Sequence, residues 1–194
     1  LFIQLSDLEV LGRIYVAEEG INAQISVPEE RLEALRTYLY SYDFLDGIRL
    51  NIAVEEKEYS FYVLKIKVKE KIVADGIDDP SFDVTKTGDY LEAESFNALT
   101  ENPETVVVDM RNYYEYEIGH FDGAVDVKAE TFREQLPKVV ETLKDKKEKP
   151  VVMYCTGGIR CEKASAYLKH QGFKEVYHRK GGVINYAHQI KEKG

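Results

Sequence analysis

Apolar and polar residues follow one pattern in the first third of this chain and another in the second half. In the first region short alternating runs predict strands, and apolar residues at helical spacing predict one helix. The predicted elements, in order, are strands at 13–17 and 23–27 around a turn at 18–22, a helix from Pro28 to Ser41, and strands at 48–54 and 59–68. This order predicts a small α+β domain, residues 1–72, of the ferredoxin-like or acylphosphatase-like type, with a strand and a helix missing before Leu1.

From residue 91 onward, short apolar runs alternate with amphipathic segments. Such an alternation predicts a parallel sheet with helices on both faces, and therefore an α/β domain over residues 91–194. A polar segment at 73–90 is predicted to be the linker. The predicted helices lie at 92–99, at 131–144, from the loop after Cys155 to His170 and from Val183, and the predicted strands lie at 105–109, at 151–154 and around Val176.

One stretch of the second domain carries candidate chemistry. The apolar run 151–154 suits a strand buried on both faces, so Cys155 falls at its carboxyl end, where α/β sheets place their ligands. Gly157 and Gly158 let the following loop curl, and the helix after it supplies backbone N–H groups and a positive dipole end. These groups and Arg160 favour the thiolate, so we expect a lowered pKa for Cys155 and a nucleophilic role.

The two cysteines are interpreted differently. A free cysteine is often a small buried hydrophobe. A purely structural Cys155, however, does not need the Gly-rich turn and the basic residue that follow it. For Cys161, in the first turn of the helix, a packing role is favoured over a second catalytic thiol. Six residues of separation fit neither a disulfide framework nor a zinc site.

The loop resembles that of rhodanese-homology domains, which have the pattern Cys-x-x-Gly-x-Arg before a helix. The resemblance implies that Cys155 carries sulfur as a persulfide and that Arg160 assists it. The loop that would hold the anionic sulfur contains Thr156, Gly157, Gly158, Ile159 and Arg160. Related phosphatases have one more residue in the loop, so the shorter loop favours sulfur over phosphate. Further rhodanese-like positions are Asp109, Arg111, Glu115, Gly119-His120, Gly123-Ala124, Gly172-Phe173 and Gly181-Gly182.

The whole chain resembles a narrower family, the rhodanese-domain tRNA uridine hydroxylases. The resemblance lies in Ala17–Asn22, Ala74–Pro80, Val106–Arg111 and Met153–Ala164. It implies oxygen-dependent formation of 5-hydroxyuridine at the wobble position of tRNA, with molecular oxygen as co-substrate. Ala23 stands where that family usually has Gly. Family members also continue into a cysteine-rich C-terminal region, so we expect this chain to be a fragment.

No fingerprint of a metal, flavin or other cofactor is recognised in the sequence. His120 and Asp122 superficially resemble part of an iron site, but they lie in a rhodanese motif that is structural. No apolar run approaches the roughly 20 residues that cross a bilayer, and no signal peptide is recognised at the start. We therefore predict a cytoplasmic protein, whose reducing environment suits a working thiol.

The charge is uneven. Residues 1–100 have 10 basic and 20 acidic residues (−10) and residues 101–194 have 16 and 15 (+1), which together give the net charge of −9. An acidic chain argues against strong nucleic-acid binding, so we expect tRNA affinity to need regions outside this chain. The lysines at 65–71 are typical of a protected edge strand. Those between 144 and 149 are typical of a solvated turn.

Three functions remain open at this point. The first is a tRNA uridine hydroxylase that uses Cys155 as a thiolate or persulfide. The second is a sulfurtransferase that moves sulfur from a donor to a small thiophilic acceptor, which the loop supports equally well. The third is a non-catalytic binding module of rhodanese fold, against which the retained Cys155, Gly157, Gly158 and Arg160 argue.

Overall fold

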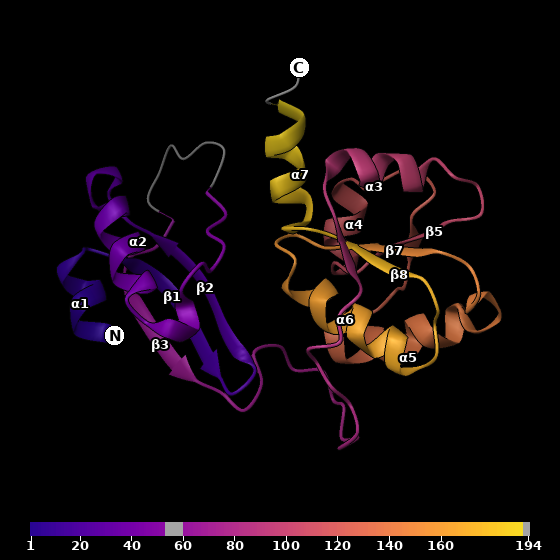
Figure 1. Cartoon of the computed structure of the whole chain (residues 1–194), viewed down its shortest axis with the longest axis horizontal. Coiled ribbons are helices and arrows are strands. Elements are labelled where there is room, and N and C mark those ends of the chain that lie inside the picture. The colour runs from indigo at the N-terminus through magenta and orange to yellow at the C-terminus, as the bar shows by residue number, and fades with distance from the viewer. Residues whose placement is uncertain (53–59, 192–194) are drawn as a thin grey trace. The chain divides into compact units, whose positions relative to one another are not determined.

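The computed structural model describes residues 1–52 and 60–191, and the chain divides into two compact units, Leu1–Ile72 and Val73–Gly194 (Figure 1). Each unit contains a sheet and hydrophobic clusters of its own. The first unit is α+β and the second is α/β, which confirms the predicted fold classes.

The first unit is a three-stranded sheet with two helices. Its elements are α1 (Phe2–Asp7), β1 (Leu11–Ala17), β2 (Gly20–Ser26), α2 (Leu32–Tyr40) and β3 (Leu64–Val68), with short 3₁₀ helices at Glu29–Arg31 and Asp43–Leu45. The strand order is β2-β1-β3; β1 pairs antiparallel with β2 and parallel with β3. Leu5 of α1 and Leu35 and Leu39 of α2 are buried against Ile14 of β1, because the apolar stripe of each helix needs a partner surface.

Several predictions for this unit are wrong in detail. The turn at 18–22 is a two-residue turn at Glu18-Glu19, since Gly20 already pairs with Ala17 and Asn22 with Tyr15. Residues 48–52 form no strand, because no neighbouring strand in the described part of the chain pairs with them; 53 and 54 lie outside the described residues. The strand predicted at 59–68 is only 64–68, where β1 supplies the partner; residue 59 is also outside the described part. Helix α1 was not predicted.

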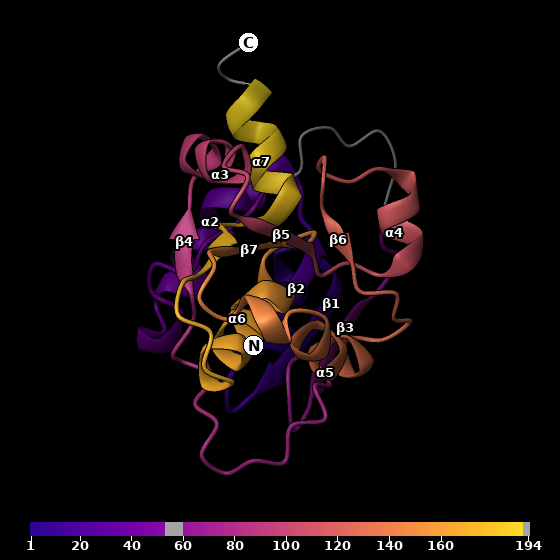
Figure 2. The same ribbon diagram turned by 90° about the vertical axis from the view of Figure 1, so that its right-hand side faces the viewer.

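The second unit is a five-stranded sheet between two layers of helices (Figures 1 and 2). The strand order is β4-β8-β7-β5-β6 and every pairing is parallel. Helices α3, α4 and α7 lie on one side of the sheet and α5 and α6 on the other. The elements are β4 (Asp89–Leu91), α3 (Ala93–Thr100), β5 (Val106–Asp109), α4 (Tyr113–Ile118), β6 (Val125–Asp126), α5 (Phe132–Thr142), a 3₁₀ helix (Lys144–Lys146), β7 (Val151–Tyr154), α6 (Ile159–His170), β8 (Val176–Arg179) and α7 (Gly182–Lys191).

Successive residues of the central strands face the two helix layers in turn. On β7, Val151 and Met153 join the cluster under α5 and α6, whereas Val152 and Tyr154 join the cluster under α3 and α7. All four are fully buried, which explains why the run has no polar member. The predicted parallel sheet with helices on both faces is confirmed, and the order of helices and strands follows the prediction. Strands β4 and β6 and helix α4 were not predicted.

Residues 73–90, predicted as the linker, lie in the second unit and contact α6. The Lys163 ammonium of α6 donates to the Asp75 carboxylate at 2.8 Å and to the Val73 carbonyl at 3.2 Å, and both charged side chains are almost fully buried. Farther along, the Gly88 N–H donates to the Ser165 hydroxyl at 2.9 Å. The segment is therefore fixed to the helix that follows the candidate active-site loop.

Candidate active site

The candidate active-site loop joins β7 to α6 and consists of residues 155–160. It leaves the carboxyl edge of the parallel sheet, where Cys155 directly follows the buried strand β7 and α6 begins at Ile159. Gly158, with φ of +104°, is the last residue before the helix, and this left-handed backbone is open to glycine at low cost. A Cβ on Gly157 would have no heavy atom within 4 Å, so that position faces open space.

Cys155 is a buried thiol whose ionised form is stabilised. Its side chain is inaccessible to solvent, and the Gly158 N–H donates to its sulfur at 3.2 Å. The Cys161 thiol donates to the same sulfur and contributes most to lowering the pKa of Cys155 to about 6. Burial opposes this shift, while the Arg160 charge and the Cys161 and Gly158 N–H groups support it. The direction of this pKa shift is the one that the sequence predicted.

Cys161 has a role that the sequence interpretation missed. It is fully buried in the cluster under α6, so the predicted packing role holds, but it also hydrogen-bonds to Cys155. Burial, together with the neighbouring Cys155 sulfur, raises the pKa of Cys161 well above its ordinary value. Because it stays protonated, Cys161 keeps an S–H group to donate. The position of Cys161 in the first turn of the helix could have indicated this contact, because the N–H group and the side chain of a residue in that turn point back toward the preceding loop.

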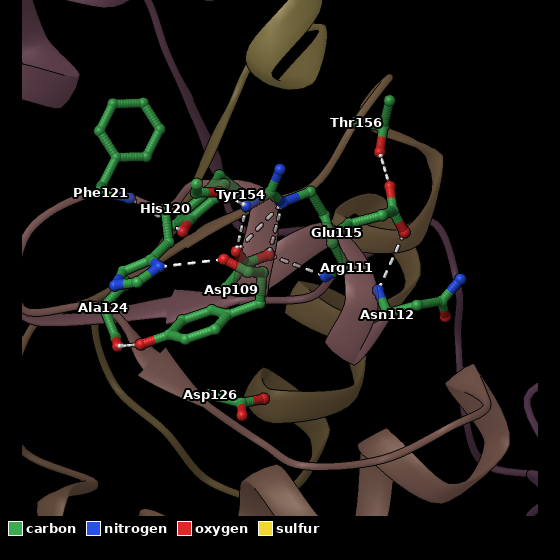
Figure 3. A network of polar contacts seen from close by, with 12 residues as sticks. Asp109, Arg111, Asn112, Glu115, His120, Phe121, Ala124, Asp126, Tyr154 and Thr156 are labelled. Atoms are coloured by element: carbon green, nitrogen blue, oxygen red, sulfur yellow. Dashed lines mark hydrogen bonds and ion pairs between the residues drawn. The ribbon is translucent and has the colours of Figure 1, made fainter.

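Arg160 is held in place by Glu115 of α4 rather than lying free in the loop. Its guanidinium donates to the two Glu115 oxygens at 3.0 and 3.2 Å and to the Thr156 hydroxyl at 2.8 Å. The Thr156 hydroxyl in turn donates to Glu115 at 2.6 Å (Figure 3). Burial raises the pKa of Glu115, but the hydrogen bonds from Arg160, Thr156 and the Asn112 N–H outweigh it, and the pKa falls to about 2. Glu115 therefore fixes both ends of the loop.

Helix α4 delivers Glu115 through a capping box. The Asn112 side chain accepts from the backbone of Glu115, while the Glu115 carboxylate accepts from the Asn112 N–H at 2.9 Å (Figure 3). The Asn-x-x-Glu spacing is a recognisable helix-start signal and could have predicted both α4 and the orientation of Glu115. That the same carboxylate reaches the loop 41 residues later follows only from the tertiary fold.

The amino end of α7 fixes the loop from another side. The Val183 N–H donates to the Cys155 carbonyl at 2.9 Å and the Ile184 N–H donates to the Thr156 carbonyl at 3.2 Å. A Cβ on Gly182 would lie 2.4 Å from both carbonyl oxygens, and its φ of +63° is left-handed. Gly182 is therefore required for this close approach. The sequence marked Gly181-Gly182 by resemblance, and the structure supplies the physical reason.

The other rhodanese-like motif is a structural brace at the end of β5. Asp109 is 2% exposed, and its carboxylate pairs with the Arg111 guanidinium at 2.7 Å. Arg111 also donates to the Gly119 carbonyl at 2.5 Å. His120 stacks on Tyr116 with ring centroids 3.8 Å apart and is exposed (Figure 3 shows His120 beside this brace). Among residues 1–52 and 60–191, no three His, Cys, Asp or Glu side chains form a group that could hold a metal ion.

The predicted site residues thus fall into one network. Cys155, Thr156, Gly158 and Arg160 are linked by the contacts above, and Gly157 and Ile159 complete the loop. No helix in the described part of the chain is long and apolar enough to span a membrane.

Comparisons with known proteins agree with this architecture. The rhodanese-like domain family matches residues 92–189, and the UPF0176 acylphosphatase like domain matches residues 2–72. A protein of Photorhabdus laumondii subsp. laumondii named tRNA uridine(34) hydroxylase is 59% identical over 195 aligned residues, which cover 100% of this chain and 55% of that protein. A Salmonella typhi protein of the same name is 58% identical over 96% of this chain and 54% of that protein. The chain spans about half the length of these relatives.

Among solved structures, a rhodanese-like domain from Anabaena sp. is 22% identical, with a TM-score of 0.44, over 52% of this chain and 74% of that one. The family match runs from Glu92, just before α3, into α7, so it leaves out β4 but includes the loop with Cys155. The chain therefore belongs to the rhodanese-like domain family, in the form that has an acylphosphatase-like domain before the rhodanese-like one.

Proposed function

We propose that this chain is part of an enzyme that hydroxylates the wobble uridine of tRNA to 5-hydroxyuridine, with Cys155 as its reactive group. The observation that carries the proposal is the identity of 58–59% to proteins named tRNA uridine(34) hydroxylase, across both units of this chain. The rhodanese-like loop is also complete, and the pKa of its cysteine is lowered to about 6. Because the relatives are about twice as long, the activity belongs to the longer protein.

The overall reaction needs O₂ and a reductant. One oxygen atom enters the C5–H bond of uridine, and the other leaves as water with two electrons and two protons from the reductant. Cytoplasmic conditions keep the thiols reduced, as the site requires.

The burial of Cys155 bears on which sulfur reacts. Its sulfur has no solvent-accessible surface, so a nucleobase has no direct path to it in this conformation of the loop. A persulfide would place its outer sulfur about 2 Å farther out. The Arg160 charge and the loop N–H groups would favour the anion of that outer sulfur. We therefore favour a persulfide on Cys155 over direct attack by the thiolate. It would form when a sulfane-sulfur donor such as thiosulfate passes its outer sulfur to the Cys155 thiolate and leaves as sulfite.

The experiment is nucleoside mass spectrometry of tRNA from cells that lack the gene. We expect the full-length protein to restore 5-hydroxyuridine and its Cys155→Ala variant to fail. Lys146→Ala, a change on the exposed surface of the same unit, serves as the expression-matched control. If the wild-type protein restores nothing, the hydroxylase proposal is wrong. Full restoration by Cys155→Ala would remove Cys155 from the mechanism.

A sulfurtransferase acting on a small thiophilic acceptor is the second candidate, favoured by the lowered pKa of Cys155 in a rhodanese-like loop. Incubation with thiosulfate should add the mass of one sulfur atom to the protein. Cys155→Ser should abolish the adduct and Cys161→Ser should retain it. Formation of the adduct together with an unchanged tRNA nucleoside profile in deletion cells would decide for this candidate.

A further inference from the structure

The three-stranded sheet of the first unit has one face that its helices do not cover. Ile14 of β1, Ile25 of β2 and Ile66 of β3 point into the cluster with α1 and α2. Side chains alternate along a strand, so the residues between these positions lie on the opposite face. That opposite face is built from Arg13 and Tyr15 of β1, Asn22 and Gln24 of β2, and Lys65 and Lys67 of β3, and is called the basic face below.

The basic face consists of two rows across the sheet. Gln24, Arg13 and Lys65 are paired in the first row, and Asn22, Tyr15 and Lys67 in the second. Just past the end of β3, the Lys69 ammonium lies 4.4 Å from the centre of the Tyr15 ring. Neither row contains an acidic residue.

The cations of this face have no carboxylate partner among residues 1–52 and 60–191. In the part of the chain that the structure describes, Arg13, Lys65 and Lys67 form no ion pair, and all three side chains are exposed. The Arg13 guanidinium lies 5.9 Å from the centre of the Phe61 ring, so Phe61, like Tyr15, has a cation beside its ring. This concentration is notable because residues 1–100 contain twice as many acidic as basic residues.

Protection of an edge strand explains only part of this pattern. Lysines on β3 do discourage another strand from pairing with its open edge. Arg13 and Tyr15, however, lie on β1, the middle strand, which has no open edge. Their presence in register with the lysines requires a different explanation.

We propose that the basic face binds the RNA substrate, in an unpaired segment next to the nucleotide to be modified. Lysine and arginine on an exposed sheet neutralise phosphates, while aromatic rings on the same sheet stack with unpaired bases. Asn22 and Gln24 add donors and acceptors for base edges or ribose hydroxyls. The proposal rests on the proposed function for the identity of the RNA, but the binding itself can be measured separately.

The test is the affinity of the 194-residue chain for a fluorescein-labelled RNA of the tRNA anticodon arm, measured by anisotropy over a range of salt concentrations. We expect weak, strongly salt-dependent binding by the wild type. In Lys65→Gln/Lys67→Gln two phosphate contacts are lost, so the slope of log K against log salt should fall by about 1.4. At about 0.1 M salt this corresponds to a loss of roughly 25-fold in affinity.

The matched control is Lys144→Gln/Lys146→Gln, which removes two exposed charges from the second unit. It should leave affinity and slope unchanged. Equal losses in the two double variants would show that only net charge matters, and no loss in Lys65→Gln/Lys67→Gln would also overturn the proposal. As a check that needs no folded variant, photocrosslinking of 4-thiouridine RNA to the wild type should label peptides containing Tyr15 or residues 61–69. Crosslinks found only in peptides of the second unit would contradict the proposal.

Two further arms separate this proposal from its alternatives. Equal binding of the face to vesicles rich in phosphatidylserine would mean that it recognises anionic membranes rather than RNA. The full-length Lys65→Gln/Lys67→Gln protein should show reduced 5-hydroxyuridine formation while still accepting sulfur from thiosulfate. If full-length wild type makes no 5-hydroxyuridine but the RNA-binding difference persists, the proposed function fails and the basic face stands.

Discussion

Replacing Cys161 by alanine should raise the pKa of Cys155. The change removes the S–H group that contributes most to holding that pKa at about 6. A hydrogen bond to a charged group contributes about 1.5–3 kcal/mol. Since one pKa unit corresponds to about 1.36 kcal/mol, the pKa of Cys155 should rise by about 1–2 units, to about 7–8. At pH 7 the thiolate fraction would then fall from roughly nine-tenths to between about one-half and one-tenth.

The assay is the rate of alkylation of Cys155 by iodoacetamide as a function of pH, read by peptide mass spectrometry. The midpoint of the profile is compared rather than the rate, because a thiolate of higher pKa is also intrinsically more nucleophilic. Cys161→Ser is the matched control, since its hydroxyl retains a donor in the same place and should keep the midpoint within about half a unit of the wild type.

Stability gives a second, independent readout of the same pair. The folded-state pKa of Cys155 is lowered, so its thiolate stabilises the fold above the ordinary thiol pKa of 9.0, and this contribution is lost as pH falls through about 6. Between those values the free energy of unfolding of the wild type should rise with pH, and it should rise less in Cys161→Ala. An unmoved alkylation midpoint in Cys161→Ala, or an equal shift in Cys161→Ser, would refute the hydrogen-bond argument.

Three further predictions concern the parts that hold the loop. Glu115→Gln should cost about 2 kcal/mol of stability, because it leaves the mostly buried Arg160 without its counter-charge. Since the pKa of Glu115 is about 2, about three-quarters of the stability that its carboxylate contributes should survive at pH 4. Complete loss of that contribution by pH 4, measured by urea unfolding, would contradict this. Gly182→Ala should destabilise the protein by roughly 3 kcal/mol, because residue 182 has a left-handed φ and its Cβ would contact the Cys155 carbonyl. Gly157→Ala is the control and should cost under about 1 kcal/mol. Equal melting temperatures of these two variants would count against the geometry. Lys163→Met should cost about 3–5 kcal/mol, because the buried Asp75 carboxylate loses the Lys163 ammonium. Asp75→Leu combined with it should recover part of that loss in a double-mutant cycle.

The parts of the fold that the sequence predicted correctly are those whose signal is local. The run 151–154 is apolar throughout because both faces of β7 are covered, and Cys155 follows it at the sheet edge in the structure as in the prediction. The errors occur where the formation of a strand depends on a neighbouring strand to pair with. Residues 48–52 alternate like a strand, yet alternation alone forms no hydrogen-bond ladder, and β3 occupies the free edge of β1. Short elements such as β6, with two residues, carry too few positions for any periodicity to appear.

In the candidate active site, too, local features could be predicted from the sequence and long-range contacts could not. Sequence reasoning identified Cys155, the glycines and Arg160, because a strand, a turn and a helix start are encoded within six residues. It could not reveal that Arg160 is neutralised by Glu115, since that pair joins residues 45 positions apart. The consequence changes the chemistry: with Arg160 paired, the direct S–H donor Cys161 contributes more than the guanidinium to stabilising the Cys155 thiolate. A residue that composition and spacing assign to packing is thus the largest single influence on the reactive sulfur, because in a buried site the nearest donor outweighs a charge already satisfied by another partner.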